Sequence, residues 1–122
     1  MTSRSGVDRL ILAEMFINEA KTEIENYGTT GNEVSYRQAC EKGWGAIAQA
    51  IMHVGQHDIY HHKEFSQVAS KLKEKGMIDI IDALAAGDRM HSAGFYHGIL
   101  SEETVANAIE LIDAAIRQIK KL

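Results

Sequence analysis

The segment ACEKGWGAIAQAI, residues Ala39 to Ile51, sets the architecture of this chain. Its large apolar residues recur at three- and four-residue steps, and small residues lie between them. This spacing predicts one buried face of an α-helix. Because a glycine costs a helix up to ~1 kcal/mol relative to alanine, Gly43 and Gly45 indicate a packing reason. We therefore expect a central helix that its neighbours approach closely.

The start of this central helix is predicted at Ser35. Gln38 follows three residues later and would complete a capping box, in which two unpaired backbone donors are satisfied. The segment QHDIYHH, residues 56–62, is ambiguous between a helix end and a loop. The predicted core stripe of the helix consists of Cys40, Trp44, Ile47, Ile51 and Val54.

Helical spacing continues on both sides of the central helix. We expect further helices from Val7 or Asp8 to about residue 27, over 62–75, over 79–96, and from Ser101 onward. The first of them is predicted to bury Ala13, Phe16, Ala20, Ile24 and Tyr27.

No segment shows the strict alternation of a β-strand over a useful length. Proline is absent from the chain, so nothing forces a kink and glycine marks the helix ends. The sequence therefore predicts an all-α protein, an up-and-down bundle of four long helices and one shorter helix.

Length and charge limit the classes of protein that the chain can represent. A chain of 122 residues is expected to form a single domain over residues 1–122. The net charge of −4 argues against a broad nucleic-acid surface, although it leaves room for a local basic groove. Cys40 is the single cysteine, which fits a reducing compartment. No signal peptide and no apolar run near ~20 residues is present, so we expect a cytoplasmic protein without a membrane partner.

Chemistry-bearing residues gather in AGDRMHSAGFYHG, residues 86–98. On a regular helix Asp88, His91 and Phe95 continue the core stripe of Ile81 and Leu84, within a sector about 80° wide. Asp88 and His91 are three residues apart and are expected to be buried and to bond to each other. In one interpretation they form a polar seam that bonds to a neighbouring helix or a second subunit. In the other, Asp88 orients His91 as a general acid or base.

Two stretches of the sequence carry a resemblance to a known family. ACEKGWGAIAQAI and DRMHSAGFYHGILSEETVANAIELI, residues 88–112, resemble two motifs of the archaeal PaREP-type family in the same order and with the same spacing. That family belongs to the HEPN-like helical bundles, so the resemblance implies an up-and-down bundle that is commonly a homodimer. The PaREP-type branch carries no settled activity that could be transferred to this chain.

Many HEPN-like proteins are metal-independent RNA endonucleases. Their motif is an Arg followed after about four to six residues by a His, and a dimer completes the site. This chain departs from that motif, because one residue separates Arg89 from His91 and seven separate Arg89 from His97. A ribonuclease would therefore need a non-standard site in which Arg89, His91 and His97 converge as catalytic residues.

A second group of histidines lies around the end of the central helix. His53, His57 and His61 follow one another at four-residue steps, and Glu64 comes three residues later. On a continuous helix they would share one face, as ligands of Zn or Ni do. The alternative is a solvated surface patch, which would follow if the helix ends near Gln56. The family resemblance implies no metal, and no cofactor is expected.

The sequence favours a non-catalytic binding or interaction module that forms a homodimer. Its interface would be a polar–aromatic seam made by Asp88, Arg89, His91, Phe95 and Tyr96, with Trp44 in the core. The candidate partners are a second copy, a nucleotidyltransferase-like protein, RNA or a nucleotide. The alternatives are the ribonuclease and the metal-binding protein. Lysines on the predicted third helix (Lys63, Lys71, Lys73 and Lys75) are the best candidates for a phosphate contact.

Overall fold

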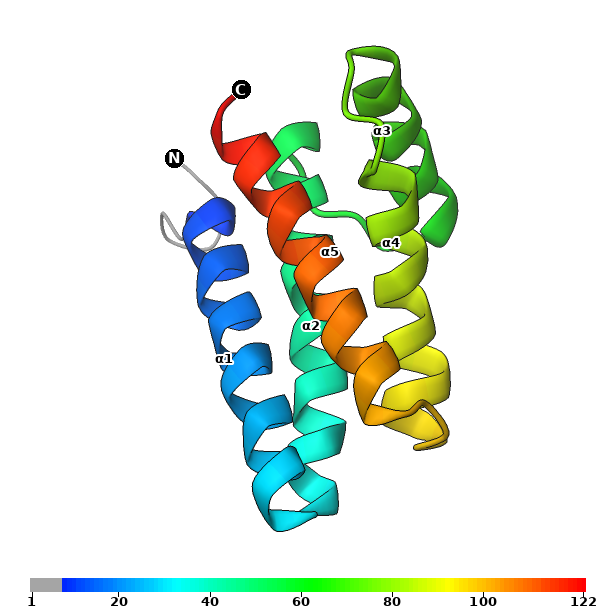
Figure 1. The fold of residues 1–122 in the computed structure, drawn as a ribbon. Coiled ribbons are helices and arrows are strands. Elements are labelled where there is room, and N and C mark those ends of the chain that lie inside the picture. The colour runs from blue at the N-terminus through cyan, green and yellow to red at the C-terminus, as the bar shows by residue number, and fades with distance from the viewer. Residues whose placement is uncertain (1–7) are drawn as a thin grey trace.

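The computed structural model describes residues 8–122, and the predicted helix start at Val7 lies outside them. The described residues form helices joined by short connections, without strands, which confirms the all-α prediction (Figure 1). The elements are α1 (Arg9–Thr30), α2 (Glu33–Gly55), α3 (His62–Glu74), α4 (Ile80–Arg89), a π-helix η2 (Met90–Tyr96) and α5 (Glu102–Lys120).

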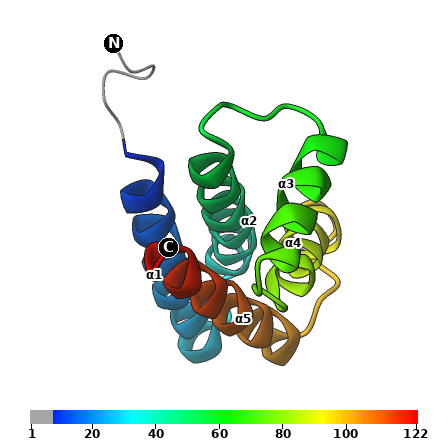
Figure 2. The same cartoon turned by 90° about the horizontal axis from the view of Figure 1, so that it is seen from above.

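The helix α2 is the central element of the bundle, as its small residues predict. It packs against α1, α3, α4, η2 and α5. Seen from above, α2 lies between α1 on one side and the α3–α4 pair on the other, while α5 crosses the front of the bundle (Figure 2). The helix α3 packs against α2 and α4 but, within the described part of the chain, not against α1 or α5. It is therefore the outermost helix of the fold.

Close approach between α2 and the α4–η2 segment depends on glycines from both sides. A Cβ atom on Gly87 would lie 2.5 Å from Cγ2 of Ile47, and one on Gly94 would lie 2.5 Å from Sγ of Cys40. On the α2 side, a Cβ atom on Gly43 would collide with Met90. These contacts are tighter than real Cβ contacts allow, so a side chain at any of these positions would force its neighbours to shift, least at Gly43, where the neighbour is the end of the flexible Met90 side chain.

The helix ends differ from the predicted ones by a few residues. The carboxylate of Asp8 accepts hydrogen bonds from the Leu10 and Ile11 backbone N–H groups and caps α1. Asn32 caps α2 in the same way, so the capping box predicted at Ser35 is wrong. Ser35 is buried inside the first turn, where its hydroxyl accepts a hydrogen bond from the Asn26 amide. The Ser101 cap of α5 is confirmed by its bond from the Thr104 N–H.

The predicted core stripes are right in their centres and wrong at their edges. Ile17 replaces Phe16 in the core of α1, and Phe16 is only partly buried, with the Lys42 ammonium 4.7 Å from its ring centre. Partly buried residues that the spacing placed on core stripes are Phe16, Tyr27, Trp44, Val54, Ile81 and Phe95. The buried core draws on every helix, and its largest side chains include Ile17, Ile47, Ile51, Ile80, Met90, Ile109, Ile112 and Ile116.

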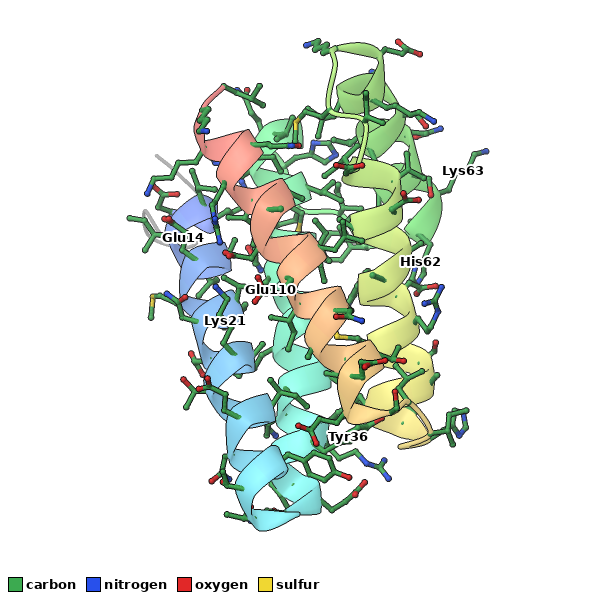
Figure 3. All side chains as sticks on the ribbon, viewed as in Figure 1. Glu14, Lys21, Tyr36, His62, Lys63 and Glu110 are labelled. Atoms are coloured by element: carbon green, nitrogen blue, oxygen red, sulfur yellow. The ribbon has the colours of Figure 1, made fainter. Side chains whose placement is uncertain are left out.

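Among residues 8–122, the buried charged group is Asp113, at the contact between α1 and α5. The Asp113 carboxylate is 10% exposed and accepts a hydrogen bond from Lys21 Nζ at 2.9 Å and another from Arg117. Figure 3 labels Lys21 on α1, facing α5. Burial acts to raise the pKa of Asp113, but the bonds from Lys21 and Arg117 outweigh it, and the pKa lies below its ordinary value.

The Cys40 thiol is sealed in the core of α2 and is predicted to be unreactive. Burial raises its pKa to about 11. Near pH 8 we expect the native protein to react with a disulfide reagent at least about 100-fold more slowly than the chain unfolded in guanidinium, because the thiolate is the reactive form. Absorbance of the released thiol measures both rates. Equal rates would contradict the buried environment of Cys40.

No helix formed by the described residues is long and apolar enough to cross a membrane.

Candidate functional site

Aromatic and imidazole rings from three elements meet on one side of α2. We refer to Trp44, His62, Phe65, His91, Phe95 and Tyr96 as the Trp44 cluster. The indole of Trp44 contacts two imidazoles, with ring centres 5.7 Å from His62 and 5.6 Å from His91. Phe65 meets the indole edge-on at 5.5 Å. The cluster thus joins α2 to α3 and to η2, and Trp44 is its hub.

Each histidine of the Trp44 cluster has a carboxylate neighbour. His91 Nδ1 is 2.8 Å from Glu41 Oε1, which is a hydrogen bond between η2 and α2. His62 Nδ1 is 3.6 Å from Asp88 Oδ1, a longer contact between α3 and α4. The predicted pairing of Asp88 with His91 is therefore wrong, and so is the prediction that both are buried, since the Asp88 side chain is 51% exposed.

The π-helix explains why the side chains of Asp88 and His91 have different partners. The prediction assumed 100° per residue through residue 96, but residues 90–96 form the wider turn of a π-helix. Met90 takes the fully buried position against Gly43, and His91 turns towards Glu41 on α2. π-Helical turns are rare and occur often at functional sites, so η2 marks this region as a candidate site.

Two residues of α2 hold the C-terminal end of η2 in place. Arg37 Nη1 donates hydrogen bonds to the backbone oxygens of Phe95 at 2.6 Å and Tyr96 at 3.2 Å. The Tyr36 hydroxyl donates to the Leu100 oxygen at 2.8 Å and accepts from the Leu100 N–H at 2.9 Å. Figure 3 shows Tyr36 at the end of the bundle where η2 connects to α5. These bonds fix the backbone of Phe95, Tyr96 and Leu100 relative to α2.

Sequence reasoning missed the residues of α2 and α3 that support the site. Arg37 and Glu41 lie at four- and three-residue steps from the predicted Trp44, with Tyr36 beside them, so the spacing on α2 carried a signal. Only the apolar residues of this part of α2, Cys40 and Trp44 among them, were assigned to a core stripe. His62 carried no such signal, since its position opposite Trp44 depends on how α3 packs.

The other predicted catalytic residues lie apart from His91. Arg89 ends α4 and is exposed, and His97 follows η2 and is exposed as well. Over residues 8–122, no hydrogen bond or ion pair joins either of them to His91. One chain therefore presents Arg89, His91 and His97 as separate groups.

The predicted metal ligands do not converge. The helix α2 ends at Gly55, and Gln56 follows in a left-handed conformation with φ 61° that turns the chain away. His57 bonds instead to the Gly55 carbonyl at 2.7 Å and to Glu64 at 3.3 Å. The hydrogen bond with the Gly55 carbonyl makes the largest contribution to raising the pKa of His57 above its ordinary value. The hydrogen bond with Glu64 raises it further.

Among the residues that the structure describes, no group of three or more His, Cys, Asp or Glu side chains is arranged to hold a metal ion. The metal-site hypothesis for His53, His57 and His61 is therefore wrong, because it required a continuous helix through residue 61.

Replacing His91 with alanine tests the Trp44 cluster. We expect His91→Ala to lower the free energy of unfolding by about 1–2 kcal/mol, because it removes the bond to Glu41 and the ring contacts with Trp44, Phe95 and Tyr96. His97→Ala removes an exposed side chain and should change the stability by less than about 0.5 kcal/mol. Urea unfolding followed by circular dichroism measures both, and equal stabilities of the two variants would contradict this role for His91.

Comparison with known proteins places the chain in one family. The model described as the Archaeal PaREP1/PaREP8 family matches residues 8–116, from the cap of α1 to near the end of α5. This range includes the whole Trp44 cluster and the three elements that form it, α2, α3 and η2. No curated protein and no solved structure matches the chain.

Proposed function

Because the chain belongs to the archaeal PaREP1/PaREP8 family, we propose that it is a non-catalytic interaction module that acts as a homodimer. The resemblance to the PaREP-type family supports this proposal, because it implies a HEPN-like bundle of a kind that is commonly a homodimer. The contact surface would lie beside the Trp44 cluster, at the end of η2.

The observation that carries the proposal is an exposed apolar surface at this end of the bundle. Tyr96 is 62% exposed and Ile99 is 74% exposed. The Tyr96 ring is held edge-on by His91 and Phe95, with ring centres 5.1 Å apart in both pairs. A large aromatic side chain that is already fixed loses little entropy on binding, and such residues often dominate interfaces. We call Tyr96 and Ile99 the Tyr96–Ile99 surface.

The charges around the Trp44 cluster favour binding over ribonuclease chemistry. Glu41 occupies Nδ1 of His91, and Asp88 lies beside His62. Carboxylates at these positions repel RNA phosphates, whereas a ribonuclease needs a positively charged cleft. The ribonuclease remains the second candidate function. It would require a dimer that brings Arg89 and His97 close to His91.

Removal of the Tyr96–Ile99 surface tests the homodimer. We expect the unmodified protein to form a dimer, and the double variant Tyr96→Ser, Ile99→Ser to weaken the dimer at least about tenfold. Light scattering coupled to size exclusion, over about 5–500 µM protein, measures the mass of each species. The comparison is valid only for variants that retain the native helix content.

Ile78→Ser provides the matched control. Ile78 is also strongly exposed, at 71%, but it lies in the connection between α3 and α4. We expect it to leave the dimer unchanged. A monomer at every concentration of the unmodified protein, or a dimer that loses as much affinity in Ile78→Ser, would contradict the proposed surface.

A further inference from the structure

A groove of about 500 Å³ runs between α3 and α4 and has no part in the Tyr96–Ile99 surface. Its floor is apolar and consists of Ile81, Leu84 and Ala85 from α4. The hydroxyls of Ser66 and Ser70 line the α3 side. The volume is that of a small-molecule site, and the lining combines an apolar floor with a few polar groups, as such sites do.

Asp88 and His62 provide the charge in this groove. The Asp88 carboxylate accepts no hydrogen bond from any residue that the structure describes, and His62 Nδ1 lies 3.6 Å from its Oδ1. This distance is beyond a hydrogen bond. A carboxylate with free acceptor sites beside an apolar floor fits an ammonium group on an organic body.

A basic strip adjoins the groove on the outer side of α3. Lys63, Gln67 and Lys71 line it, and it shares Ser66 and Ser70 with the groove. In Figure 3 Lys63 projects from α3 away from the bundle. Within residues 8–122 neither Lys63 nor Lys71 makes an ion pair, so both ammonium groups are available to an anion. Opposite charges therefore lie on the two sides of the serine pair.

We propose that the α3–α4 groove binds a small zwitterion with an ammonium group at one end and a carboxylate at the other. The ammonium would pair with Asp88, and the apolar body would cover Ile81, Leu84 and Ala85. The carboxylate would reach past the serine hydroxyls to Lys63 or Lys71. The site discriminates by charge, because the lysines repel a plain cation and Asp88 repels a plain anion.

Three probes of equal chain length separate these contributions. We expect ε-aminohexanoate to bind at least about tenfold more tightly than hexanoate or hexylamine, since each of these lacks one charged end. Isothermal titration calorimetry measures all three. Failure of ε-aminohexanoate to bind, or binding of hexanoate or hexylamine with equal affinity, would overturn the proposal.

Substitutions in the groove and in the basic strip test where ε-aminohexanoate binds. Asp88→Asn and the double variant Lys63→Gln, Lys71→Gln should each weaken ε-aminohexanoate at least about tenfold. Lys73→Gln is the matched control, because Lys73 also lies on α3 but lines neither the groove nor the strip. All of these side chains are at the surface, and unchanged melting temperatures verify the fold. Equal affinity in Asp88→Asn and Lys73→Gln would overturn the assignment to this groove and would leave the proposed dimer untouched.

Discussion

Replacing Gly87 with valine is expected to lower the free energy of unfolding by about 3 kcal/mol, which corresponds to roughly 10 °C in melting temperature for a chain of this size. The first added carbon would lie 2.5 Å from Cγ2 of Ile47 and 3.3 Å from Cε3 of Trp44. Ile47 is fully buried, so it cannot turn out into solvent. Relief of the clash therefore requires α4 to move away from α2.

The matched control for Gly87 is Gly55→Ala. A Cβ atom there meets only ordinary van der Waals contacts, at 3.4 Å and beyond. Because alanine favours the helix over glycine, this change should be neutral or stabilising by up to about 1 kcal/mol. Calorimetry gives the melting temperature of each variant. A Gly87→Val protein as stable as the parent would show that α2 and α4 do not pack closely.

The double variant Lys21→Met, Arg117→Met should lower the free energy of unfolding near pH 7 by about 3 kcal/mol, because it leaves the buried Asp113 carboxylate without a partner. Water that reaches Arg117, which is 67% exposed, keeps the loss from being larger. Lys120→Met removes the partner of Glu14 between the same two helices, at the surface. This control should cost less than about 1 kcal/mol.

The pH dependence of this double variant should have the opposite sign to that of the parent. In the parent, the lowered pKa of Asp113 means that its stabilising effect is present above the unfolded pKa, near 4, and is lost as the pH falls through the folded value. In the variant, burial alone raises the pKa, so its destabilising effect diminishes as the pH falls from about 7 towards 4. Urea unfolding at several pH values measures this, and parallel curves would contradict the buried ion pairs.

The sequence predicted the helices because long amphipathic segments repeat one spacing many times. Small residues on α2 correctly indicated a central helix, since nothing but close packing explains glycine inside it. The start of α2 was misplaced because Asn32 and Ser35 are both good cap residues, and a local rule cannot choose between them.

The candidate site was predicted less well than the fold. The π-helix changes the angle per residue within one element, and no residue in MHSAGFY requires it by itself. Gly94 permits it, because η2 can approach Cys40 only without a side chain at that position. Consequently Asp88 and His91, which share a stripe on a regular helix, have different partners.

Contacts between residues far apart in the sequence could not be predicted for a different reason. His62 and Trp44 are far apart in sequence, and their stacking depends on the path of residues 56–61. Gln56 adopts the left-handed conformation that glycine or asparagine would have signalled. The same turn separates His53 from His57 and removes the metal site that four-residue spacing suggested.

The most direct test of a non-catalytic module is cleavage of a mixed RNA pool by the purified protein, with EDTA and with added divalent metal. His91→Ala and His97→Ala serve as variants, and retained helix content shows that they are folded. We expect no cleavage above the buffer blank in either condition. Cleavage by the unmodified protein that is lost in a folded His91→Ala or His97→Ala variant would contradict the proposal and identify a ribonuclease with a non-standard site.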